Sequence, residues 1–569
     1  MPLLAGNNMT FDANYFKAQF PLFDQPENHG LVYLDNAATT QKPQCVIDAI
    51  SHFYVSQNGN AQRASHRLAR AATAMLEQTR QQAADFLGAA SLDNVVFTSG
   101  ATEALNMIAY GLSGFCTAGD EILLSHAEHH ANLLPWQRLA EQRQCSLIFF
   151  PEEQGLPCWQ QWLSVLSERT RIIAFTGASN VLGSVLDVGI IATIKLRFPQ
   201  VIVVVDASQM ACHIPLQAEQ WQCDFLACSA HKFYGPTGIG LLYGRTAHLQ
   251  EMLPLMVGGE MVSKVDLNSS SFVEGVQRFE AGTSSLSAIA GLGACLQFWQ
   301  AQDRPTMQIY ERQLTVYLHQ QLNVVCNKAS GLQLLSLAEN NVGIAVVVAT
   351  ASSNHGVALS DLGHWLDEHD IAVRVGDHCA QPLWQALAPV YGSDKGLRIS
   401  LAAYNTREDI DQLVGAINSF LPITEGLQVR DQNTKQENFS SLQWRDLMAV
   451  KSWQQRFKIL VGWGKHITEK PAIRQDQYLV RGCESTVWLK HHAQGERHYF
   501  LMDSDSNVIK GLSALLLVWF NGKTSKEIAR INIPDRYQQL GLQKHLSPSR
   551  MNGFMALLSA INAYTASKR

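Results

Sequence analysis

The chain has 569 residues, of which 46% are apolar and 16% charged, with a formal net charge of −5. This length predicts two to four domains, and the composition is typical of a soluble globular protein. No apolar run approaches twenty residues, so no membrane span is expected, and residues 1–10 lack the basic and apolar regions of a secretion signal. We therefore expect a cytoplasmic protein with no membrane partner.

Charge is distributed unevenly along the chain. Residues 440–569 carry 19 Lys and Arg against 9 Asp and Glu, a net charge of +10, whereas residues 1–439 carry 25 against 40, a net charge of −15. A basic segment is typical of nucleic-acid binding, but no stripe of Lys and Arg with interleaved aromatic residues is present. We therefore expect no nucleic-acid partner and expect the basic part to dock on its acidic neighbour.

The eleven cysteines are scattered and contain no Cys-x-x-Cys pair. This spacing argues against a disulfide framework and against a zinc site, so no metal is expected. Most of the cysteines are expected to be small buried residues in a reducing cytosol.

The first elements expected in chain order are a strand and turn at 31–37, helices at 43–54 and 68–87, and a strand at 95–97. The strand is followed by Thr-Ser-Gly-Ala-Thr-Glu-Ala-Leu-Asn at 98–106, a small-residue turn that leads into a helix. Backbone N–H groups at such a helix start, together with Thr102, form an anion site. A simple N-cap at Thr102 is the alternative, but it would not need Ser99 and Gly100 as well.

A strand at 120–124 leads to three histidines within five residues, His126, His129 and His130. Such a cluster suggests a metal, but no cluster of Cys, Asp or His elsewhere completes a site. An imidazole stacked on a planar cofactor fits a loop after a strand better.

Strands are also expected at 146–150 and 172–176, the second followed by Gly-Ala-Ser-Asn-Val-Leu-Gly at 177–183. The alternation of strand and helix across 95–245 predicts a mainly parallel sheet with helices on both faces. Each polar cluster follows the carboxyl end of a strand, which is where open α/β sheets bind ligands.

Lys232 follows a buried strand at 225–228 and precedes a glycine-rich turn, after which another strand begins at Gly240. A second buried strand, at 201–205, ends at Asp206. Buried lysines are rare unless paired, and one use of a desolvated lysine is a Schiff base with a carbonyl cofactor. This arrangement suits pyridoxal phosphate (PLP), whose aldehyde would be held by Lys232 and whose pyridinium nitrogen by Asp206. A structural lysine in a loop is the alternative.

Residues 258–287 are expected to be loop-like. Seven further elements are expected: helices at 286–302 and 306–323, a strand at 341–349, a helix at 359–368, a strand that runs into a loop at 371–382, a strand at 397–401 and a helix at 408–420. They predict an α+β module separate from the first sheet. Polar and Pro/Gly residues at 422–439 indicate a linker, and 440–569 is rich in helix signals with a strand pair at 487–489 and 499–502.

Residues 31–420 resemble the PLP-dependent cysteine desulfurases of the class V aminotransferase group, specifically the Suf/Csd type (group II). The matching stretches are Tyr33-Leu-Asp-Asn-Ala-Ala38, Glu128-His-His-Ala-Asn132, Ser179-Asn-Val-Leu-Gly183, Ser229-Ala-His-Lys-Phe-Tyr-Gly-Pro-Thr-Gly-Ile-Gly240, Arg278-Phe-Glu-Ala-Gly-Thr283 and Arg374-x-Gly-x-His-Cys-Ala-x-Pro382.

Residues 445–565 are similar to the SufE/CsdE sulfur-acceptor family. The residues that carry this similarity are Val480-Arg-Gly-Cys483-Glu-Ser-x-Val-Trp488, Asp503-Ser-Asp505, Ile509-Lys-Gly-Leu512 and His545-Leu-Ser-Pro-Ser-Arg550. The two families are usually separate partner chains, and here they look fused.

The resemblance implies the α/β fold type I of PLP-dependent transferases, followed by a separate α+β acceptor domain. The desulfurase would span 1–421, with a large PLP domain at about 31–285 and a small domain built from the N-terminal segment and about 286–421. The linker would span 422–439 and the acceptor domain 440–569. A homodimer is implied as well.

The resemblance also assigns roles to residues. Lys232 would hold the PLP aldehyde, Asp206 the pyridine nitrogen and Gln209 the phenolic oxygen, while His129 would stack on the ring and could move a proton. The phosphate would be bound by Thr102, Ser229 and His231, and by Thr283 across the dimer. The substrate carboxylate would be held by Asn180 and Arg398, since an arginine fork suits a carboxylate.

Cys379 would be the nucleophile that takes sulfur from L-cysteine as a persulfide and leaves L-alanine. Arg374, near it in sequence, would also bind the substrate, and His378 could stabilise the Cys379 thiolate. Cys483 would then accept the sulfur by thiol–persulfide exchange, with support from Arg550, before delivery to an iron–sulfur scaffold or another acceptor. A buried structural cysteine is the alternative for Cys483.

The sequence departs from the family pattern at several positions. Gly177 stands where a histidine is common, Gln62 precedes Arg63 where His-Arg is typical, Ala207 replaces a glycine, and Asp377 replaces a frequent histidine. The segment 384–396 looks longer than usual and could reshape the docking surface for the acceptor domain.

Two other functions stay open on the sequence. The same fold could serve a selenocysteine lyase or a cysteine sulfinate desulfinase, whose reactions depend less on a nucleophilic thiol. A degenerate desulfurase that serves only as a scaffold for iron–sulfur assembly would not need Lys232, Asp206, His129, Cys379 and Arg398 together.

Overall fold

The computed structural model describes residues 11–62, 65–153, 156–158, 161–328, 331–337, 339–350, 357–425, 439, 442–450, 453–464, 466–481, 486–540 and 548–566. Contacts along the chain divide it into two compact units. The first unit comprises 1–324, 333–348 and 372–412, and the second comprises 325–332, 349–371 and 413–569. The domain limits expected at 421 and 440 stay a prediction.

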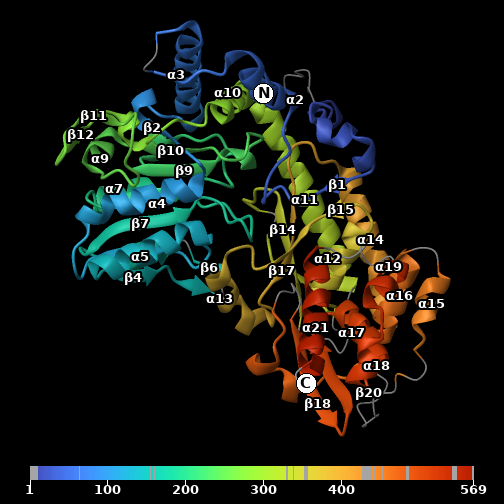
Figure 1. Cartoon of the computed structure of the whole chain (residues 1–569). Helices are drawn as coiled ribbons and strands as arrows, with labels where there is room; N and C mark the ends of the chain where they lie inside the picture. The colour runs from blue at the N-terminus through green and yellow to red at the C-terminus, as the bar shows by residue number, and fades with distance from the viewer. Residues whose placement is uncertain are drawn as a thin grey trace, which may run out of the picture. The chain divides into compact units, whose positions relative to one another are not determined.

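A seven-stranded sheet forms the centre of the first unit (Figure 1). In spatial order its strands are β2 (Val95–Thr98), β10 (Gly240–Gly244), β9 (Phe225–Ser229), β8 (Ile202–Asp206), β7 (Thr170–Thr176), β3 (Glu121–Leu124) and β4 (Ser146–Phe149). The pairs from β9 to β4 are parallel, whereas β10 is antiparallel to both β2 and β9. The predicted mainly parallel α/β sheet is confirmed.

Side chains alternate between the two faces of this sheet, as the period of a strand requires. In β8, Ile202 and Val204 belong to one apolar cluster, together with α4 (Ala101–Gly111) and α5 (Leu134–Arg143). Val203 and Val205 belong to the other cluster, which is shared with helices that include α3 (Arg67–Leu87), α7 (Ile190–Arg197) and α10 (Leu286–Gln300). Both faces are therefore covered, which explains why the strands read as continuous apolar runs.

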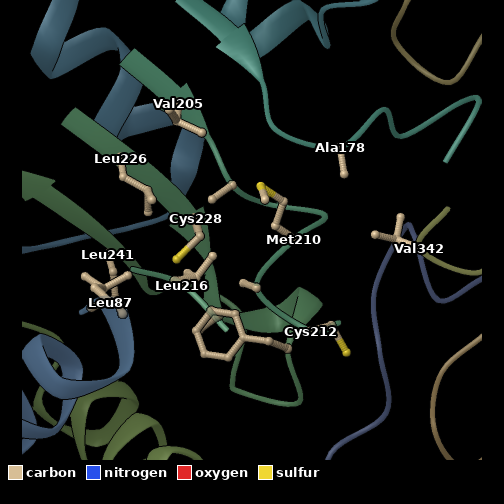
Figure 2. Close-up of a cluster of buried hydrophobic side chains, with 14 of the residues drawn as sticks. Leu87, Ala178, Val205, Met210, Cys212, Leu216, Leu226, Cys228, Leu241 and Val342 are labelled. Atoms are coloured by element: carbon tan, nitrogen blue, oxygen red, sulfur yellow. The ribbon is translucent and has the colours of Figure 1, made fainter. Parts of the chain in front are cut away.

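Figure 2 shows the second cluster where three neighbouring strands supply Val205, Leu226 and Leu241. Met210, from the loop after β8, lies in the same cluster. Apolar packing of Met210 therefore fixes the loop after β8, which carries candidate cofactor ligands.

The remaining helices before residue 285 are short. They are α1 (Ala13–Lys17), η1 (Pro21–Asp24), η2 (Pro26–Asn28), α2 (Gln44–His52), the π-helix η3 (Phe53–Gln57), η4 (Leu92–Asn94), η5 (Leu112–Phe115), η6 (His130–Asn132), α6 (Trp162–Val165), α8 (Ala218–Trp221), η8 (Ala230–Lys232), α9 (Thr246–Glu251) and η9 (Val276–Phe279). The long helix α3 ends at Gly88, whose φ of +65° is a conformation that glycine adopts without strain.

A second, four-stranded sheet has the order β13 (Leu332–Leu334), β14 (Ile344–Ala349), β17 (Gly396–Ser400) and β16 (Arg374–Gly376), and β17 is antiparallel to both β14 and β16. Its neighbours in sequence are α11 (Arg304–Lys328), α12 (Leu359–Asp367), α13 (Gln381–Tyr391) and α14 (Arg407–Glu425). Two-residue strands β1 (Val32–Tyr33) and β15 (Ile371–Ala372) pair, as do β5 (Glu152–Glu153) and β6 (Leu156–Pro157). The expected α+β module is present.

Two local expectations are corrected, and the segment 384–396, for which no element was expected, is partly helical. Residues 258–287 are not all loop, because β11 (Val262–Val265) and β12 (Ser270–Phe272) form a hairpin. The segment 384–396 begins as the helix α13, whose Leu383, Trp384 and Leu387 are buried. α14 continues to Glu425, into the expected linker, and most of the rest of that linker lies outside the described residues.

The C-terminal part is helical around one β-sheet, as expected. Its elements are α15 (Trp444–Ala449), α16 (Trp453–Gly464), η10 (Pro471–Ile473), η11 (Asp476–Tyr478), β18 (Val487–Gln494), β19 (Arg497–Ser504), α17 (Asn507–Phe520), β20 (Lys523–Thr524), α18 (Ser525–Ala529), α19 (Ile533–Leu540) and α21 (Pro548–Ala566). Gly511 lets α17 approach α16 closely, because a Cβ there would lie 2.0 Å from the Leu460 carbonyl oxygen. Among the described helices none is both long and apolar enough to cross a membrane.

Candidate active site

Three of the expected site residues lie at the carboxyl ends of neighbouring strands of the large sheet. Asp206 ends β8 and Ser229 ends β9, while Lys232 follows β9 within the single turn η8. Residue pairing in the sheet places Asp206 beside Thr176 on one side and Ala227 on the other. The sheet therefore brings these polar groups to one edge, as the sequence predicts.

The partly exposed Lys232 lies within the electrostatic influence of the buried Asp206 carboxylate. Burial lowers the pKa of the Lys232 ammonium, and the Asp206 carboxylate opposes this change. Asp206 is 5% exposed, and its Oδ1 accepts a hydrogen bond from the Ser208 N–H at 3.0 Å. Desolvation that lowers the pKa of a lysine leaves more of the amine neutral, and the neutral amine is the form that attacks an aldehyde.

The first turn of α4 forms a cradle with the end of β9. The Ala101 N–H donates to Ser229 Oγ at 2.8 Å. Gly100 precedes α4 as its N-cap, and a Cβ on Gly240 would lie 2.6 Å from the Gly100 Cα. Thr102 lies in the first turn rather than at the N-cap, so the alternative of a simple N-cap at Thr102 is wrong. Glycines, backbone N–H groups and hydroxyls at a helix N-terminus suit a phosphate.

His129 lies in the loop after β3, and its ring is neutral. Its Nδ1 accepts a hydrogen bond from the Ala131 N–H at 3.1 Å, which leaves the proton on Nε2. Burial, together with the charge of Lys232, lowers the pKa of His129 to about 4. His129 and Thr102 line one pocket, together with Asn106, His130, Ala131, Leu134, Pro135 and Arg138.

The residue before His129, Glu128, fixes this loop. Its Oε1 accepts from Ser125 Oγ at 2.5 Å and from the Thr176 N–H at 3.0 Å, and its Oε2 accepts from Asn132 Nδ2 at 2.6 Å. Burial raises the pKa of Glu128 to about 8. The carboxyl group therefore ties the His129 loop to the end of β7.

Cys379 is exposed and lies in a backbone conformation that non-glycine residues rarely adopt. His378 and Cys379 have φ values of +52° and +57° in succession. Each such residue costs about 1–3 kcal/mol and persists only where neighbours hold it. The His130 N–H donates to the Cys379 carbonyl at 2.8 Å, the Cys379 N–H to Asp377 Oδ1 at 3.1 Å, and Asn180 Nδ2 to the His378 carbonyl at 2.8 Å.

His378 does not stabilise a Cys379 thiolate by charge, which corrects the expectation from sequence. Its Nε2–H donates to the Gly396 carbonyl at 3.2 Å. Burial, and then the charge of Arg398, lowers the pKa of His378 to about 3. A neutral imidazole held on a carbonyl supports the loop without supplying a positive charge.

Arg398 presents one unused donor inside the protein. Its Nη1 donates to the Asn180 carbonyl at 3.0 Å and its Nη2 to Asp35 Oδ1 at 3.1 Å. Arg398 is only 3% exposed, and its buried Nε makes no hydrogen bond within the described structure. A buried guanidinium with a free donor fits an incoming carboxylate.

Asp35 was not singled out by the sequence analysis, although it stands in the quoted Tyr-Leu-Asp-Asn stretch. Its Oδ2 accepts from Arg374 Nη2 at 2.8 Å while its Oδ1 accepts from Arg398. Arg374, with a half-exposed side chain, is thus joined to Arg398 through one carboxylate, and its expected contact with substrate stays a prediction. Because both guanidinium groups donate to the same carboxylate, their orientations are fixed together.

The other predicted cofactor residues are placed as follows. Gln209 Nε2 donates to the Ala37 carbonyl at 2.8 Å, which leaves a second N–H on the amide. The backbone carbonyl of His231 accepts from Lys42 Nζ at 3.0 Å, and burial lowers the pKa of its ring to about 4. Thr283 lines a different pocket from Thr102, together with Asn60, Ala61, Gln62, Leu76, Glu260, Gln277, Glu280, Gly282, Ser284 and Leu286.

The space beside Gly177 is filled by a methionine. A Cβ on Gly177 would lie 2.1 Å from Met210 Sδ and 3.3 Å from Val205 Cγ1. A histidine at this position, common in the related family, is therefore excluded while Met210 keeps its place. Gln62, the other departure, has a φ of +76°, and its N–H donates to Thr73 Oγ1 at 2.7 Å.

Cys483 lies outside the described residues, and so does the side chain of Arg550 in α21. The residues on either side of the Cys483 loop are described. The Val480 N–H donates to the Val487 carbonyl at 2.9 Å, and the Thr486 N–H donates to Asp505 Oδ1 at 3.0 Å. The described residues that precede and follow 482–485 are therefore hydrogen-bonded to the β18–β19 hairpin and its immediate neighbours.

Residues 32–413 match the family model described as aminotransferase class-V, and residues 443–565 match the model described as Fe-S metabolism associated domain (SufE). The probable cysteine desulfurase of Vibrio cholerae is 39% identical over 417 residues, which cover 72% of this chain and 98% of that protein. The chain belongs to the cysteine desulfurases of the class-V aminotransferase family. The probable cysteine desulfurase of Pseudomonas putida is 37% identical, over 73% of this chain and 99% of that protein.

The crystal structure of the cysteine desulfurase CsdA from Escherichia coli is similar to this desulfurase with a TM-score of 0.65 and 34% identity, over 74% of this chain and all of that one. The family resemblance, the fold class and the SufE domain are thereby confirmed. Cysteine desulfurases of this fold use PLP, and the site fits it on three observations: a lysine whose pKa is lowered, a buried carboxylate whose charge acts on that lysine, and a glycine-lined cradle at a helix N-terminus.

Proposed function

We propose that the enzyme converts L-cysteine to L-alanine, takes the sulfur on Cys379 and passes it to Cys483 of its own SufE domain. The observation that carries the proposal is the hydrogen-bonded connection from Arg398 through Asn180 to the Cys379 loop. A substrate carboxylate bound at Arg398 is thus placed by the same residue that holds the nucleophile's loop. Binding and attack share one framework.

Bound PLP supplies the electron sink that makes the Cα proton of the substrate acidic. Arg398 Nε binds the substrate carboxylate, and the Lys232 amine takes the Cα proton. The Cys379 thiolate attacks the substrate sulfur, so that an S–S bond forms while the Cβ–S bond breaks. The electron pair of the broken bond stays on Cβ, which takes up a proton and becomes the methyl group, and the Lys232 ammonium returns a proton to Cα to complete alanine.

The second step moves the outer sulfur without net oxidation. The Cys483 thiolate attacks the outer sulfur of the Cys379 persulfide, a new S–S bond forms, and Cys379 leaves as a thiolate. The product on Cys483 is available to an iron–sulfur scaffold or another sulfur acceptor. We further propose a cytoplasmic homodimer in which Thr283 contacts the phosphate site of the second copy, which accounts for its separate pocket.

The test is mass spectrometry of the full chain after a single addition of ³⁴S-labelled L-cysteine. Label is expected on Cys379 and then on Cys483 in the wild type, on Cys379 alone in Cys483→Ser, and on neither in Cys379→Ser. Cys45→Ser, a change at another exposed cysteine, is the matched control and should label as the wild type does. Label on Cys483 in the Cys379→Ser variant would contradict the relay.

The same variants separate the alternative substrates. Cys379→Ser is expected to lose alanine release from L-cysteine at least a hundredfold, since the reaction needs the thiolate. Retention of alanine release from L-selenocysteine, with loss only from L-cysteine, would indicate a lyase in place of the desulfurase.

A further inference from the structure

Helix α12 is buried on two opposite faces. Leu359, Leu362 and Leu366 recur at helical spacing and form its apolar face. Asp361 and His364 point from the other side of the helix, yet they are only 2% and 6% exposed. A helix with one apolar and one polar face normally exposes the polar face to water. Because Asp361 and His364 are buried, another segment of the chain covers the polar face of α12.

The cover is the N-terminus of α17, from the SufE part of the chain. Ser506 Oγ donates to Asp361 Oδ1 at 2.6 Å, and the Asn507 N–H donates to Asp361 Oδ2 at 2.8 Å. Ser506 is fully buried and is the N-cap of α17. A carboxylate that accepts from a helix N-terminus is favoured by charge as well as by hydrogen bonding. Residues 349–371 and 413–569 belong to one compact unit.

The docked end of the SufE domain is the end that carries the acceptor loop. Asp505, next to Ser506, accepts from the Thr486 N–H at 3.0 Å and from Thr486 Oγ1 at 3.2 Å. Ser504 Oγ donates to the Thr486 carbonyl at 2.8 Å. Thr486 is three residues after Cys483, so the contact with Asp361 is one short step from the base of the Cys483 loop.

We propose that the Asp361 face of α12 is the docking surface for the chain's own SufE domain, and that Asp361 is a positioning residue for sulfur relay. The proposal rests on the proposed relay for its functional half, whereas the docking itself stands on the contacts of Asp361. The chemistry is complementary: an acidic side chain on the desulfurase part meets the positive end of a helix on the basic part. The contact holds residues 486 and 504–507 of the SufE domain beside α12.

Asp361→Asn tests the surface with the least change of shape. The amide retains one oxygen acceptor but turns an NH₂ group toward a donor, so one of the two hydrogen bonds is lost. Hydrogen–deuterium exchange of peptides that span residues 505–512, measured on the full-length holoenzyme, should become about tenfold faster for the loss of one charge-assisted hydrogen bond. Asp367→Asn, on the exposed side of the same helix, is the control and should leave exchange unchanged.

The functional readout is the rate at which label moves from Cys379 to Cys483 after a single turnover. Asp361→Asn should slow this transfer several-fold and leave the first appearance of alanine unchanged. Unchanged exchange together with unchanged transfer would overturn the proposal. If the wild type places no label on Cys483, the relay fails, and the exchange measurement still decides whether α12 is the docking surface.

Ser506→Ala removes the same hydrogen bond from the other side and guards against misfolding of the Asp361 variant. Because both changes break one contact, the effect of Asp361→Asn on exchange should be smaller in the Ser506→Ala background than in the wild type. Full additivity of the two effects would show that Asp361 and Ser506 are not coupled, and would overturn the docking contact.

Discussion

Asp35 and Arg398, 363 positions apart in sequence, are joined by a hydrogen bond of 3.1 Å from Nη2 to Oδ1. The same carboxylate receives Arg374 at 2.8 Å. Since Arg398 Nε is left free, Asp35 determines the direction in which this donor points. We therefore expect Asp35 to influence substrate binding by orienting Arg398, without touching the substrate.

Asp35→Asn should raise the KM for L-cysteine more than it lowers kcat. A hydrogen bond between charged groups contributes about 1.5–3 kcal/mol, so the loss in kcat/KM should be about 10–100-fold. Steady-state alanine release measures both constants. Asp24→Asn, at an exposed position, is the control, and an unchanged KM in Asp35→Asn would contradict the role.

Gly177→Ala should lower the free energy of unfolding, because the new methyl group would overlap Met210 Sδ. Overpacking of a buried site costs about 1–3 kcal/mol. Urea denaturation of the holoenzyme measures the loss. The double variant with Met210→Ala should recover part of it, and equal losses in the single and double variants would show that Met210 is not the obstacle.

His378 should make the protein less stable in acid. Its pKa is about 3 in the folded protein against an ordinary 6.5, so the unfolded chain binds the proton more readily. Stability is therefore complete above about pH 6.5 and falls as the pH drops toward 3. Between pH 7 and pH 5 the loss from this one group is about 2 kcal/mol at most. Urea denaturation at the two pH values, with His378→Gln as the comparison, should show a shallower dependence in the variant.

Glu280→Ala should destabilise the first unit strongly. Glu280 accepts two hydrogen bonds from Arg80, at 2.7 and 2.8 Å, and a third from the Phe97 N–H at 2.8 Å. Removal of one partner from a buried ion pair costs about 3–5 kcal/mol because the other charge stays buried. Thermal unfolding measures the change, and Glu274→Ala, at an exposed residue, should be nearly neutral.

The elements that were predicted correctly have local signals. Buried strands such as β8 and β9 are continuous apolar runs, and α3 stops at a glycine that adopts a positive φ. The helix α13 was not predicted, because prolines at 382 and 389 disguise its pattern. The hairpin of β11 and β12 was not predicted either, because its residues are mostly exposed and carry little apolar periodicity.

The sequence by itself predicted the cofactor lysine and its carboxylate partner, because each follows a buried apolar strand, and the family resemblance predicted the nucleophile. Only the tertiary structure decided the neutral state of His378, the filling of the Gly177 space by Met210, and the contact of Asp361 with α17. These depend on burial and on contacts between distant segments. Burial and contacts between distant segments arise only when the sheets and helices pack, so they cannot be read from the local sequence.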